Sequence, residues 1–439
     1  MRISTLASAS NEGCYGPAPV NRLLYVCLDG LGDDPIPEFG GRTPLEAADT
    51  PFLDSLAGRG RLGSVTTVGE GIAPESDIAV FAILGYDPRE EHPGRGVVEA
   101  IGAGMEFRDG DLAYRVNFAT CEWPTIIDRR VGRDLTSDEA SALAEAVNRE
   151  LTLSSATFEL RATIEHRGVL VIRDSRGPLS AEVTNTDPAY RKEGSLGVAL
   201  ETFENEVARC EPLEDVPEAR RAAELTNAFV EGSHQVLERS DVNAKRRTAG
   251  KLAGNLVLTR DGGDHVPGLQ PIKDRFGPSW GCFVEMPVER GIALLLGMQE
   301  VTAPWVDGTD ESYARWAALA AEALEGYDAL YIHIKGPDIP AHDGRAEDKR
   351  DVIAAIDRAF FGQVLPELPR DVLVAVTADH STSCPRKAHT DDPVPLVVAG
   401  PGVSSDSSTA FGESQARRGS IGHIRGVEIV ARLVELLRG

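Results

Sequence analysis

The chain has 439 residues, of which 42% are hydrophobic and 26% charged, a composition typical of globular proteins. Its formal net charge of −24 argues against nucleic acid and acidic membrane surfaces as partners, and no apolar run is long enough to cross a membrane. The length predicts two domains, or one domain that carries a large insertion.

The N-terminal segment and the cysteines bear on the cellular compartment. Residues 1–22 contain no compact apolar stretch, so we expect a loose N-terminus and not a signal peptide. The six cysteines are scattered along the chain and form no C-x-x-C pair. Such spacing is typical of free thiols in a reducing compartment and offers no zinc–cysteine site. We therefore expect a cytoplasmic protein, while the sequence leaves its oligomeric state open.

Both ends of the chain alternate between strand-like and helical patterns. Four short apolar and β-branched segments predict buried parallel strands, at residues 23–28, 329–334, 372–377 and 395–400. Helices are predicted between them, at residues 51–60, 76–85, 312–326 and 345–365. This alternation predicts an α/β fold in which helices flank a mostly parallel sheet.

The middle of the chain is organised differently. Strand-like stretches and helical patterns are mixed there, at residues 112–120, 137–151, 168–174 and 217–239. We interpret residues 91–267 as an α+β domain inserted into a first domain, which consists of residues 1–90 and 268–439.

The segment PESDIAVFAILGYDP (74–88) leaves two roles open for Ser76. Pro74, Ser76 and Asp77 precede an apolar run, the usual pattern at the start of a helix, so Ser76 can be a simple helix cap. A serine at this position can also be a nucleophile, because the positive end of a helix stabilises an alkoxide and a bound phosphate. The local pattern by itself favours the cap.

Three of the predicted strands are followed by side chains that can bind metal ions. Asp29 follows the first strand, Asp338 lies just beyond the second, and Asp379 and His380 follow the third. In open α/β sheets the functional crevice lies beyond the carboxyl ends of the strands. We therefore expect these side chains to converge although they are far apart in the sequence.

Two further histidines extend this set. Asp338 and His342 form a D-x-x-x-H pair, and His389 follows His380 by nine residues. Carboxylate and imidazole together suit a divalent transition ion such as Mn²⁺ or Zn²⁺ better than Mg²⁺ alone. The number of candidate ligands exceeds what one ion needs, so the sequence favours a pair of ions.

Structural alternatives exist for the neighbouring polar residues. An aspartate after a strand is often a turn residue, and His333, inside an apolar strand, fits a hydrogen-bonded core histidine better than a ligand. Asp33 and Asp34 can simply solvate a loop.

Eight motifs occur in order along the chain. They are LDGLGD (28–33), TPLEAADTPFLDSLA (43–57), PESDIAVFAILGYDP (74–88), GRGVVEAIGAGM (94–105), NFAT (117–120), DRRVGR (128–133), HIKGPDIPAHDG (333–344) and TADHSTSCPRKAHTDDPVPL (377–396). This set resembles the archaeal-type cofactor-independent phosphoglycerate mutases, members of the alkaline phosphatase superfamily. The resemblance implies an alkaline-phosphatase-like sheet and the interconversion of 2-phosphoglycerate and 3-phosphoglycerate, small anionic substrates, through a phosphoserine.

The resemblance assigns roles position by position. Ser76 falls on the serine that accepts the phosphoryl group, which decides its open role in favour of the nucleophile. Two divalent ions are implied, with Mn²⁺ favoured over Zn²⁺, Co²⁺ and Mg²⁺. The implied ligands are Asp29, Ser76, Asp379 and His380 for one ion, and Asp338, His342 and His389 for the other. Lys335 is expected to be catalytic, because a cation there stabilises charge on the transferring phosphoryl group.

The inserted domain is expected to bind the substrate and to close the site against water. Guanidinium groups bind carboxylate and phosphate through two parallel hydrogen bonds, so arginines are the candidate substrate ligands. They are Arg115, Arg129, Arg133, Arg246 and Arg290. Each of them, taken singly, can equally be a surface charge.

Departures from the family pattern fall on the substrate side. LAGN (252–255) stands where the family usually has Pro-Ala-Asn, and RDGG (260–263) where it has Arg-Gly-Ala-Gly. Arg290 replaces a lysine, and WVDGTD (305–310) replaces Gly-Ala-Thr-Gly. These changes keep open a related phosphotransferase or phosphatase that acts on another phosphorylated metabolite or on a phosphonate. A metal-free binding protein is disfavoured, because every predicted ligand position holds a competent ligand type.

Overall fold

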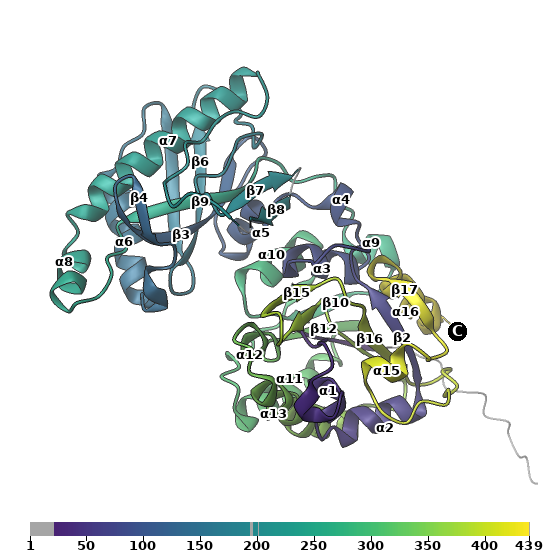
Figure 1. Ribbon diagram of the computed structural model, residues 1–439. Helices are drawn as coiled ribbons and strands as arrows, with labels where there is room; N and C mark the ends of the chain where they lie inside the picture. Colours follow the sequence, from purple (N-terminus) through teal and green to yellow (C-terminus); the bar gives the residue numbers. More distant parts are fainter. Residues whose placement is uncertain (1–21, 194–195, 201, 439) are drawn as a thin grey trace, which may run out of the picture.

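The computed structural model describes residues 22–193, 196–200 and 202–438 (Figure 1). Most of the predicted loose N-terminus, residues 1–21 with Cys14, lies outside the described residues. The five described cysteines are buried free thiols. Across the described ranges, no helix has the length and apolar character needed to span a membrane.

A central eight-stranded sheet has the order β11-β10-β12-β1-β13-β16-β2-β17. Its strands are β11 (Gln299–Glu300), β10 (Trp280–Phe283), β12 (Ala329–Ile334), β1 (Arg22–Leu28), β13 (Val372–Thr377), β16 (Val394–Ala399), β2 (Arg61–Thr66) and β17 (Gly422–Arg425). All pairings are parallel except those of β16 with its two neighbours. The predicted α/β fold with a mostly parallel sheet is therefore confirmed.

The direction predicted for residues 395–400 is wrong. This segment is strand β16, and it runs antiparallel to both β13 and β2. For two neighbouring strands to be parallel, the chain must cross back from the carboxyl end of the first strand to the opposite end of the sheet before the second strand begins. Between β13 and β16 the chain forms only the small hairpin of β14 (Ser381–Ser383) and β15 (Ala388–Thr390). Strand β16 therefore starts at the end of the sheet where β13 finished and runs in the opposite direction.

The register of the central strands aligns their carboxyl ends. Cys27 of β1 pairs with His333 of β12 and with Thr377 of β13. Every residue from Leu23 to Leu28 is buried, as expected for a strand covered on both faces, which explains the uninterrupted apolar sequence. The residues that follow these three strands consequently lie side by side.

Two groups of helices cover the sheet, on opposite sides of it in Figure 1. The first group packs around the π-helical segment η3 (Asp357–Phe361) and contains α2 (Pro51–Arg59), α11 (Asp310–Ala323), α13 (Ala346–Ile356) and α14 (Gly362–Glu367). The second contains α3 (Ser76–Ile83), α10 (Pro287–Leu295) and α16 (Ile429–Arg438). The single helix predicted at 345–365 is thus α13, η3 and α14 in succession. Shorter helices are α1 (Pro44–Ala47), α4 (Pro88–Glu91), α9 (Ile272–Phe276), α12 (Asp338–His342) and α15 (Glu413–Ala416).

A second, antiparallel sheet lies apart from the first, at the upper left of Figure 1. Its strands are β3 (Leu112–Glu122), β4 (Thr125–Asp128), β5 (Ala156–Ala162), β6 (Arg167–Asp174) and β9 (Leu256–Gly263). The helices of this part are α6 (Ser137–Glu150), α7 (Pro217–Glu238) and α8 (Asp241–Thr248), and β7 (Tyr190–Glu193) and β8 (Leu196–Ala199) form a separate hairpin. The sheet and its helices share a hydrophobic core separate from that of the central sheet.

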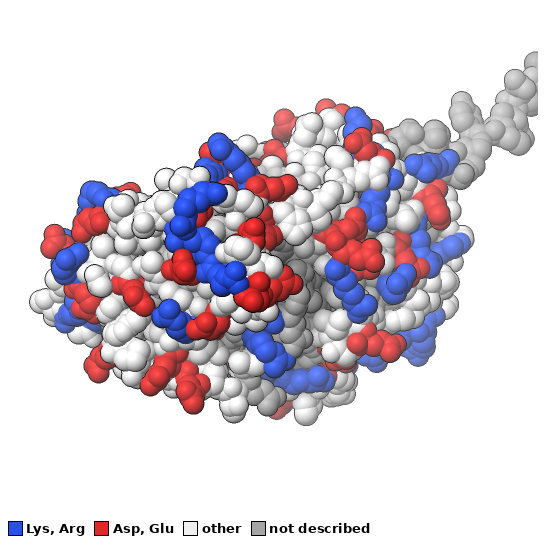
Figure 2. Space-filling model, turned by 90° about the horizontal axis from the view of Figure 1, so that it is seen from above, with Lys and Arg blue, Asp and Glu red and all other residues white. Residues whose placement is uncertain are grey.

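Helix α5 (Arg95–Gly102) joins the two parts, because it packs on β3 and also crosses α10. The crossing is close: a Cβ atom on Gly291 would lie 1.9 Å from the carbonyl oxygen of Val98, and one on Gly102 would lie 1.7 Å from that of Pro287. Only glycine permits this approach of two helix backbones. On the face shown in Figure 2, acidic and basic side chains are interspersed over the described surface.

Candidate metal centre and nucleophile

The ends of β1, β12 and β13 bring four predicted site residues together. Asp29, Asp379 and His380 are at most 1% exposed. His380 Nε2 lies 3.4 Å from Asp29 Oδ1 and 3.2 Å from Asp379 Oδ2. Lys335 Nζ donates a hydrogen bond to Asp29 Oδ2 and forms an ion pair with this carboxylate. The side chains that the strand-end argument expected to converge do so.

Ser76 lies at the edge of this group. It is the first residue of α3, while Glu75 is the N-cap, so Ser76 is not the cap residue. Its hydroxyl is half-buried and lies 3.2 Å from His380 Nε2. The helix start predicted from the sequence is therefore real, but the serine side chain faces the buried carboxylates and imidazole.

Asp338, His342 and His389 form a second group next to the first. His342 Nε2 lies 3.1 Å from His389 Nε2, and Asp338 Oδ1 lies 3.4 Å and 3.6 Å from these two atoms. The ring of His389 stacks on that of His380 with 3.8 Å between centroids. His389 Nδ1 donates to the carbonyl oxygen of Pro74 at 2.8 Å, so Nε2 is the nitrogen left for a metal ion. Burial opposes protonation of the ring, but the hydrogen bond to Asp338 raises the pKa of His389 to about 9, so a bound ion would displace the Nε2 proton.

The donor sets suit divalent metal ions. The ligand atoms of Asp29, Asp338 and His380 lie within 4.8 Å of one another, as do those of Asp338, His342 and His389. Within the described chain, the buried atoms Asp29 Oδ1 and Asp379 Oδ2 have no hydrogen-bond partner. Buried carboxylate oxygens without donors are costly unless a cation compensates them, and carboxylate with imidazole is a transition-ion ligand set.

The pKa values describe the same crowding of negative charge. Burial raises the pKa of Asp379 to about 7, and the charge of Asp29 adds to this effect. Burial also opposes ionisation of Asp29, but the neighbouring Lys335 ammonium holds its pKa well below the ordinary value. Burial lowers the pKa of His380 to about 3, so its ring is neutral and can act as a ligand.

Glu289 is a site residue that the sequence did not single out. It is 1% exposed on α10, and Lys335 Nζ lies 2.7 Å from its Oε1. His333 is hydrogen-bonded to the Tyr331 hydroxyl, as a core histidine would be, and its Nε2 lies 3.8 Å from both Asp29 and Glu289. No clear signal in the sequence marks Glu289, because it stands next to Arg290 in a helix pattern that accommodates charged residues.

A cavity of about 30 Å³ lies between the start of α3 and the second sheet. Its lining residues are Glu75, Asp77, Ile78, Arg95, Arg115, Tyr190, Gly197 and Asp261. Burial lowers the pKa of Arg115 to about 10, with a further contribution from the nearby charges of Arg260 and Arg95. Three guanidinium groups therefore gather beside the start of α3.

Some of these arginine donors are unused. Arg115 Nε and Arg260 Nε and Nη1 are buried and, among the described residues, have no hydrogen-bond partner. The Arg260 guanidinium lies over the Tyr190 ring, 3.8 Å from its centroid. Arg115 Nε lies 3.4 Å from Glu99 Oε1 and Arg260 Nε lies 3.6 Å from Asp261 Oδ2, but neither contact is a hydrogen bond. These buried donors are therefore available to an anion. Arg95 and Arg260 were not predicted as site residues, although both fall in motifs that the sequence displayed, GRG (94–96) and RDGG (260–263).

The other predicted arginines have protein partners or lie on the surface. Arg129 makes a two-point ion pair with Asp187 at 2.7 Å and 2.5 Å. Arg246 is buried in ion pairs with Asp134 and Glu139, and Arg290 pairs with Glu300. Arg133 is exposed and lines a surface pocket with Arg129 and Arg130. Only Arg115 of the predicted set lines the cavity beside Ser76.

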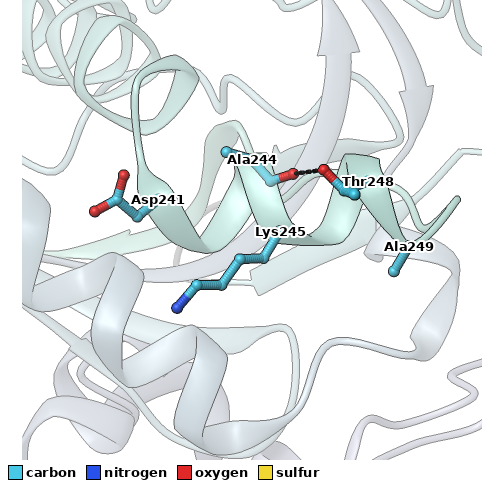
Figure 3. A pocket seen from close by; sticks show the side chains of 5 residues that line it. All are labelled: Asp241, Ala244, Lys245, Thr248 and Ala249. Atoms are coloured by element: carbon cyan, nitrogen blue, oxygen red, sulfur yellow. Dashed lines mark hydrogen bonds between the residues drawn. The ribbon is translucent and has the colours of Figure 1, made fainter.

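A separate surface depression lies on α8 (Figure 3). It is lined by Asp241, Ala244, Lys245, Thr248 and Ala249, all from this helix or the residue that follows it. The side chains of Asp241 and Lys245 point toward the same side of the helix in Figure 3 and do not meet there, and Thr248 Oγ1 donates to the carbonyl oxygen of Ala244. These five residues do not converge on a common point, so we assign no function to the depression.

The fold and the site together define the class of this protein. It is an α/β protein in which a serine and clustered candidate ligands for divalent metal ions lie at the carboxyl ends of the strands of a mostly parallel sheet. A sequence profile described as 2,3-bisphosphoglycerate-independent phosphoglycerate mutase matches residues 57–243. A protein of that description from Aeropyrum pernix is 42% identical over 429 residues, covering 95% of this chain and 100% of the relative. The chain belongs to the 2,3-bisphosphoglycerate-independent phosphoglycerate mutase family.

Solved structures agree with this assignment. A cofactor-independent phosphoglycerate mutase from Thermoplasma acidophilum has a TM-score of 0.65 at 31% identity, covering 95% of this chain and 100% of the other. A protein from Pyrococcus horikoshii has a TM-score of 0.79 at 30% identity, covering 96% and 98%. The family resemblance inferred from the eight motifs is confirmed.

Proposed function

We propose that the protein is a metal-dependent phosphoglycerate mutase that interconverts 2-phosphoglycerate and 3-phosphoglycerate through a phosphoserine at Ser76. The observation that carries the proposal is the position of Ser76 Oγ, 3.2 Å from His380 Nε2, while the residues on either side of Ser76 in the chain, Glu75 and Asp77, line the arginine cavity. The start of α3 thus brings a nucleophile and a cation site close to an anion site.

The candidate ligands of the first ion are Asp29, Ser76, Asp379 and His380, and those of the second are Asp338, His342 and His389. When bound, two divalent ions would supply Lewis-acid charge that makes the serine hydroxyl more acidic and neutralises the transferring phosphoryl group. The mixed carboxylate and imidazole set favours Mn²⁺, with Zn²⁺, Co²⁺ and Mg²⁺ as alternatives.

The residues of the chain supply binding and orientation. The N-terminus of α3 directs backbone N–H groups toward a phosphate at Ser76, and the Lys335 ammonium adds a fixed positive charge beside Asp29. Ser76 Oγ loses its hydroxyl proton and forms a bond to phosphorus as the bond from phosphorus to the substrate oxygen breaks, and the freed oxygen takes up one proton, so that the step is balanced. The glycerate stays bound and turns. Its other hydroxyl then loses its proton and bonds to phosphorus as the bond from phosphorus to Ser76 Oγ breaks, and Oγ takes up a proton, which restores Ser76.

Retention of the glycerate requires a second anchor, and the cavity beside α3 provides the groups for one. The guanidinium groups of Arg95, Arg115 and Arg260 suit the substrate carboxylate, because they gather at one place and outnumber the hydrogen bonds that the protein offers them. Each lies near an acidic side chain, but the buried Arg115 Nε and Arg260 Nε and Nη1 donors make no hydrogen bond to the described residues. Arg115 and Arg260 belong to the inserted domain that we delimit at residues 91–267. Tyr190 and Gly197 of the β7–β8 hairpin line the same cavity, so this domain can cover the intermediate and exclude water.

The test is an activity assay of purified protein with 3-phosphoglycerate, after metal removal with EDTA and after reloading with Mn²⁺. We expect activity that depends on metal and not on 2,3-bisphosphoglycerate. Ser76→Ala should abolish it. Ser137→Ala is the matched control, because Ser137 is likewise the first residue of a helix, α6, on the second sheet.

Trapping of the intermediate distinguishes this mechanism from others. Intact-mass measurement after rapid acid quench should detect one added phosphate on the wild type and none on Ser76→Ala. Wild-type protein that is inactive under each of the four ions would contradict the proposal, as would near-normal turnover by Ser76→Ala. We also expect a cytoplasmic enzyme, in agreement with the five buried free thiols.

A further inference from the structure

Lys349 is a fully buried lysine for which the proposed mechanism gives no role. It lies on α13, and its side chain is 0% exposed. Its Nζ donates to the carbonyl oxygens of Gly32 and Thr382, each at 2.8 Å, and to Asp33 Oδ2 at 3.0 Å. An ammonium group has three N–H donors, so all of them are used.

The acceptors belong to the two segments that carry the buried metal ligands. Gly32 and Asp33 follow Asp29 in the loop after β1, and Thr382 follows His380 in β14. The two segments are also bonded to each other, by Thr382 N to Gly32 O and by Cys384 N to Asp33 Oδ1, both at 2.9 Å. Lys349 therefore closes a junction between the Asp29 loop and the His380 segment.

The junction leaves little room for adjustment. A Cβ atom on Gly32 would lie 2.0 Å from the side-chain Oγ of Ser381 and 3.2 Å from its Cα, so Gly32 packs directly against Ser381. Asp33 is buried and ion-paired, and the alternative that it only solvates a loop is excluded. A shift of either segment would stretch the hydrogen bonds of Lys349.

Thr382 connects this junction to the ligands themselves. Its carbonyl oxygen accepts from Lys349, while its hydroxyl donates to Asp338 Oδ1 at 2.7 Å and lies 3.1 Å from His380 Nδ1. The hydroxyl thus orients one ligand from each candidate ion site. Helix α12, which carries Asp338 and His342, packs against α13, which carries Lys349.

We propose that Lys349 is a positioning residue of the metal centre, which fixes the loop of Asp29 against the segment of Asp379 and His380. A buried ion pair stabilises a fold no better than apolar residues of similar size, so stability alone does not explain a lysine there. Groups that hydrogen-bond metal ligands or orient them commonly change metal affinity 10- to 100-fold. The inference rests on the proposed function, because it requires that the centre binds metal.

The test measures metal binding and not turnover. EDTA-treated protein is titrated with Mn²⁺ to obtain the dissociation constants and the number of ions bound, and unfolding of the apoprotein is followed separately. Lys349→Met should weaken Mn²⁺ binding about 10- to 100-fold. Because this change leaves the Asp33 carboxylate buried without its partner and can prevent folding, Asp33→Asn/Lys349→Met removes both charges and should show the same loss of affinity.

Asp357→Asn is the matched control. Asp357 is a buried carboxylate of the same core, and it accepts from the backbone N–H groups of Phe52 and Leu53 at the start of α2. Its substitution should lower stability and leave the Mn²⁺ dissociation constants unchanged. Wild-type affinity in the folded Lys349 variants would overturn the inference and leave the proposed function intact. Failure of the wild type to bind any divalent ion would instead overturn the proposed function, and this inference with it.

Discussion

Glu413 should make the stability of this protein fall as the pH rises through the weakly acidic range. The residue begins α15, is 4% exposed, and accepts a hydrogen bond at 2.7 Å from Thr43 Oγ1. Burial raises its pKa from the ordinary 4.5 to about 7, although the bond from Thr43 acts in the opposite direction. The folded protein therefore holds this proton more tightly than the unfolded chain does.

The sign and size of the effect follow from proton linkage. Between pH 4.5 and about 7 the folded state binds more protons at this position than the unfolded state, so the free energy of unfolding decreases as the pH rises. Each pKa unit corresponds to about 1.4 kcal/mol, so the full shift amounts to about 3 kcal/mol. The contribution is lost as the pH rises through the folded pKa, and stability is then constant with respect to this group.

Glu413→Gln isolates the effect, because glutamine has a similar shape and does not ionise. Urea unfolding is measured from pH 4 to pH 8 for both proteins, and the difference in unfolding free energy is plotted against pH. We expect the variant to gain up to about 3 kcal/mol relative to the wild type between the two ends of this range. Contributions of other groups, such as Asp357 with its pKa raised to about 6 by burial, cancel in the difference. Parallel curves for the two proteins would refute the reasoning.

Two further predictions concern the anion site and the helix crossing. Arg115→Met and Arg260→Met should each raise KM for phosphoglycerate about 10- to 100-fold, because each change removes a charge-assisted hydrogen bond to the substrate. Arg315→Met, on the exposed face of α11, is the control and should leave KM unchanged. An unchanged KM in both cavity variants would argue against the carboxylate anchor. Gly291→Ala should lower the free energy of unfolding in urea by about 1–3 kcal/mol, because its Cβ would lie 1.9 Å from Val98 O. Gly58→Ala in α2 is the control: a Cβ there would have no neighbour within 4 Å, so the change should be neutral or stabilising. Equal effects of the two changes would show that α5 and α10 can separate freely.

The sequence predicted the elements of the central sheet well because burial on both faces leaves a strong local pattern. Most residues of β1, β12 and β13 face a helix layer and are apolar, so the segments appear as nearly continuous apolar runs, with His333 as an exception in β12. The strand-end rule then placed Asp29, Asp379 and His380 together without any contact information. The direction of β16 could not be predicted in this way, since an apolar run looks the same in either direction.

The substrate side was predicted less well for a different reason. An arginine carries no local sign of whether its guanidinium faces a cavity or an acidic side chain. Arg246 and Arg290 pair with acidic side chains away from Ser76, whereas Arg95 and Arg260, which were not selected, gather with Arg115 beside α3 and also have acidic neighbours there. Glu289 and Lys349 were missed because a buried charge in a helix is recognisable only from what surrounds it.

The sequence by itself determined the family, the mostly parallel sheet and the residue types of the metal centre, because motifs and hydrophobic periodicity are local properties of the chain. Only the tertiary structure decided the relations between distant residues. Ser76 lies beside His380, which is 304 positions away in the sequence, and is not the cap residue of α3. Lys349 donates hydrogen bonds to Gly32 and to Thr382, two residues that are more than 300 positions apart from each other. These contacts depend on the pairing order and register of β1, β12 and β13. Register is set by the packing of the whole sheet, so no single segment encodes it.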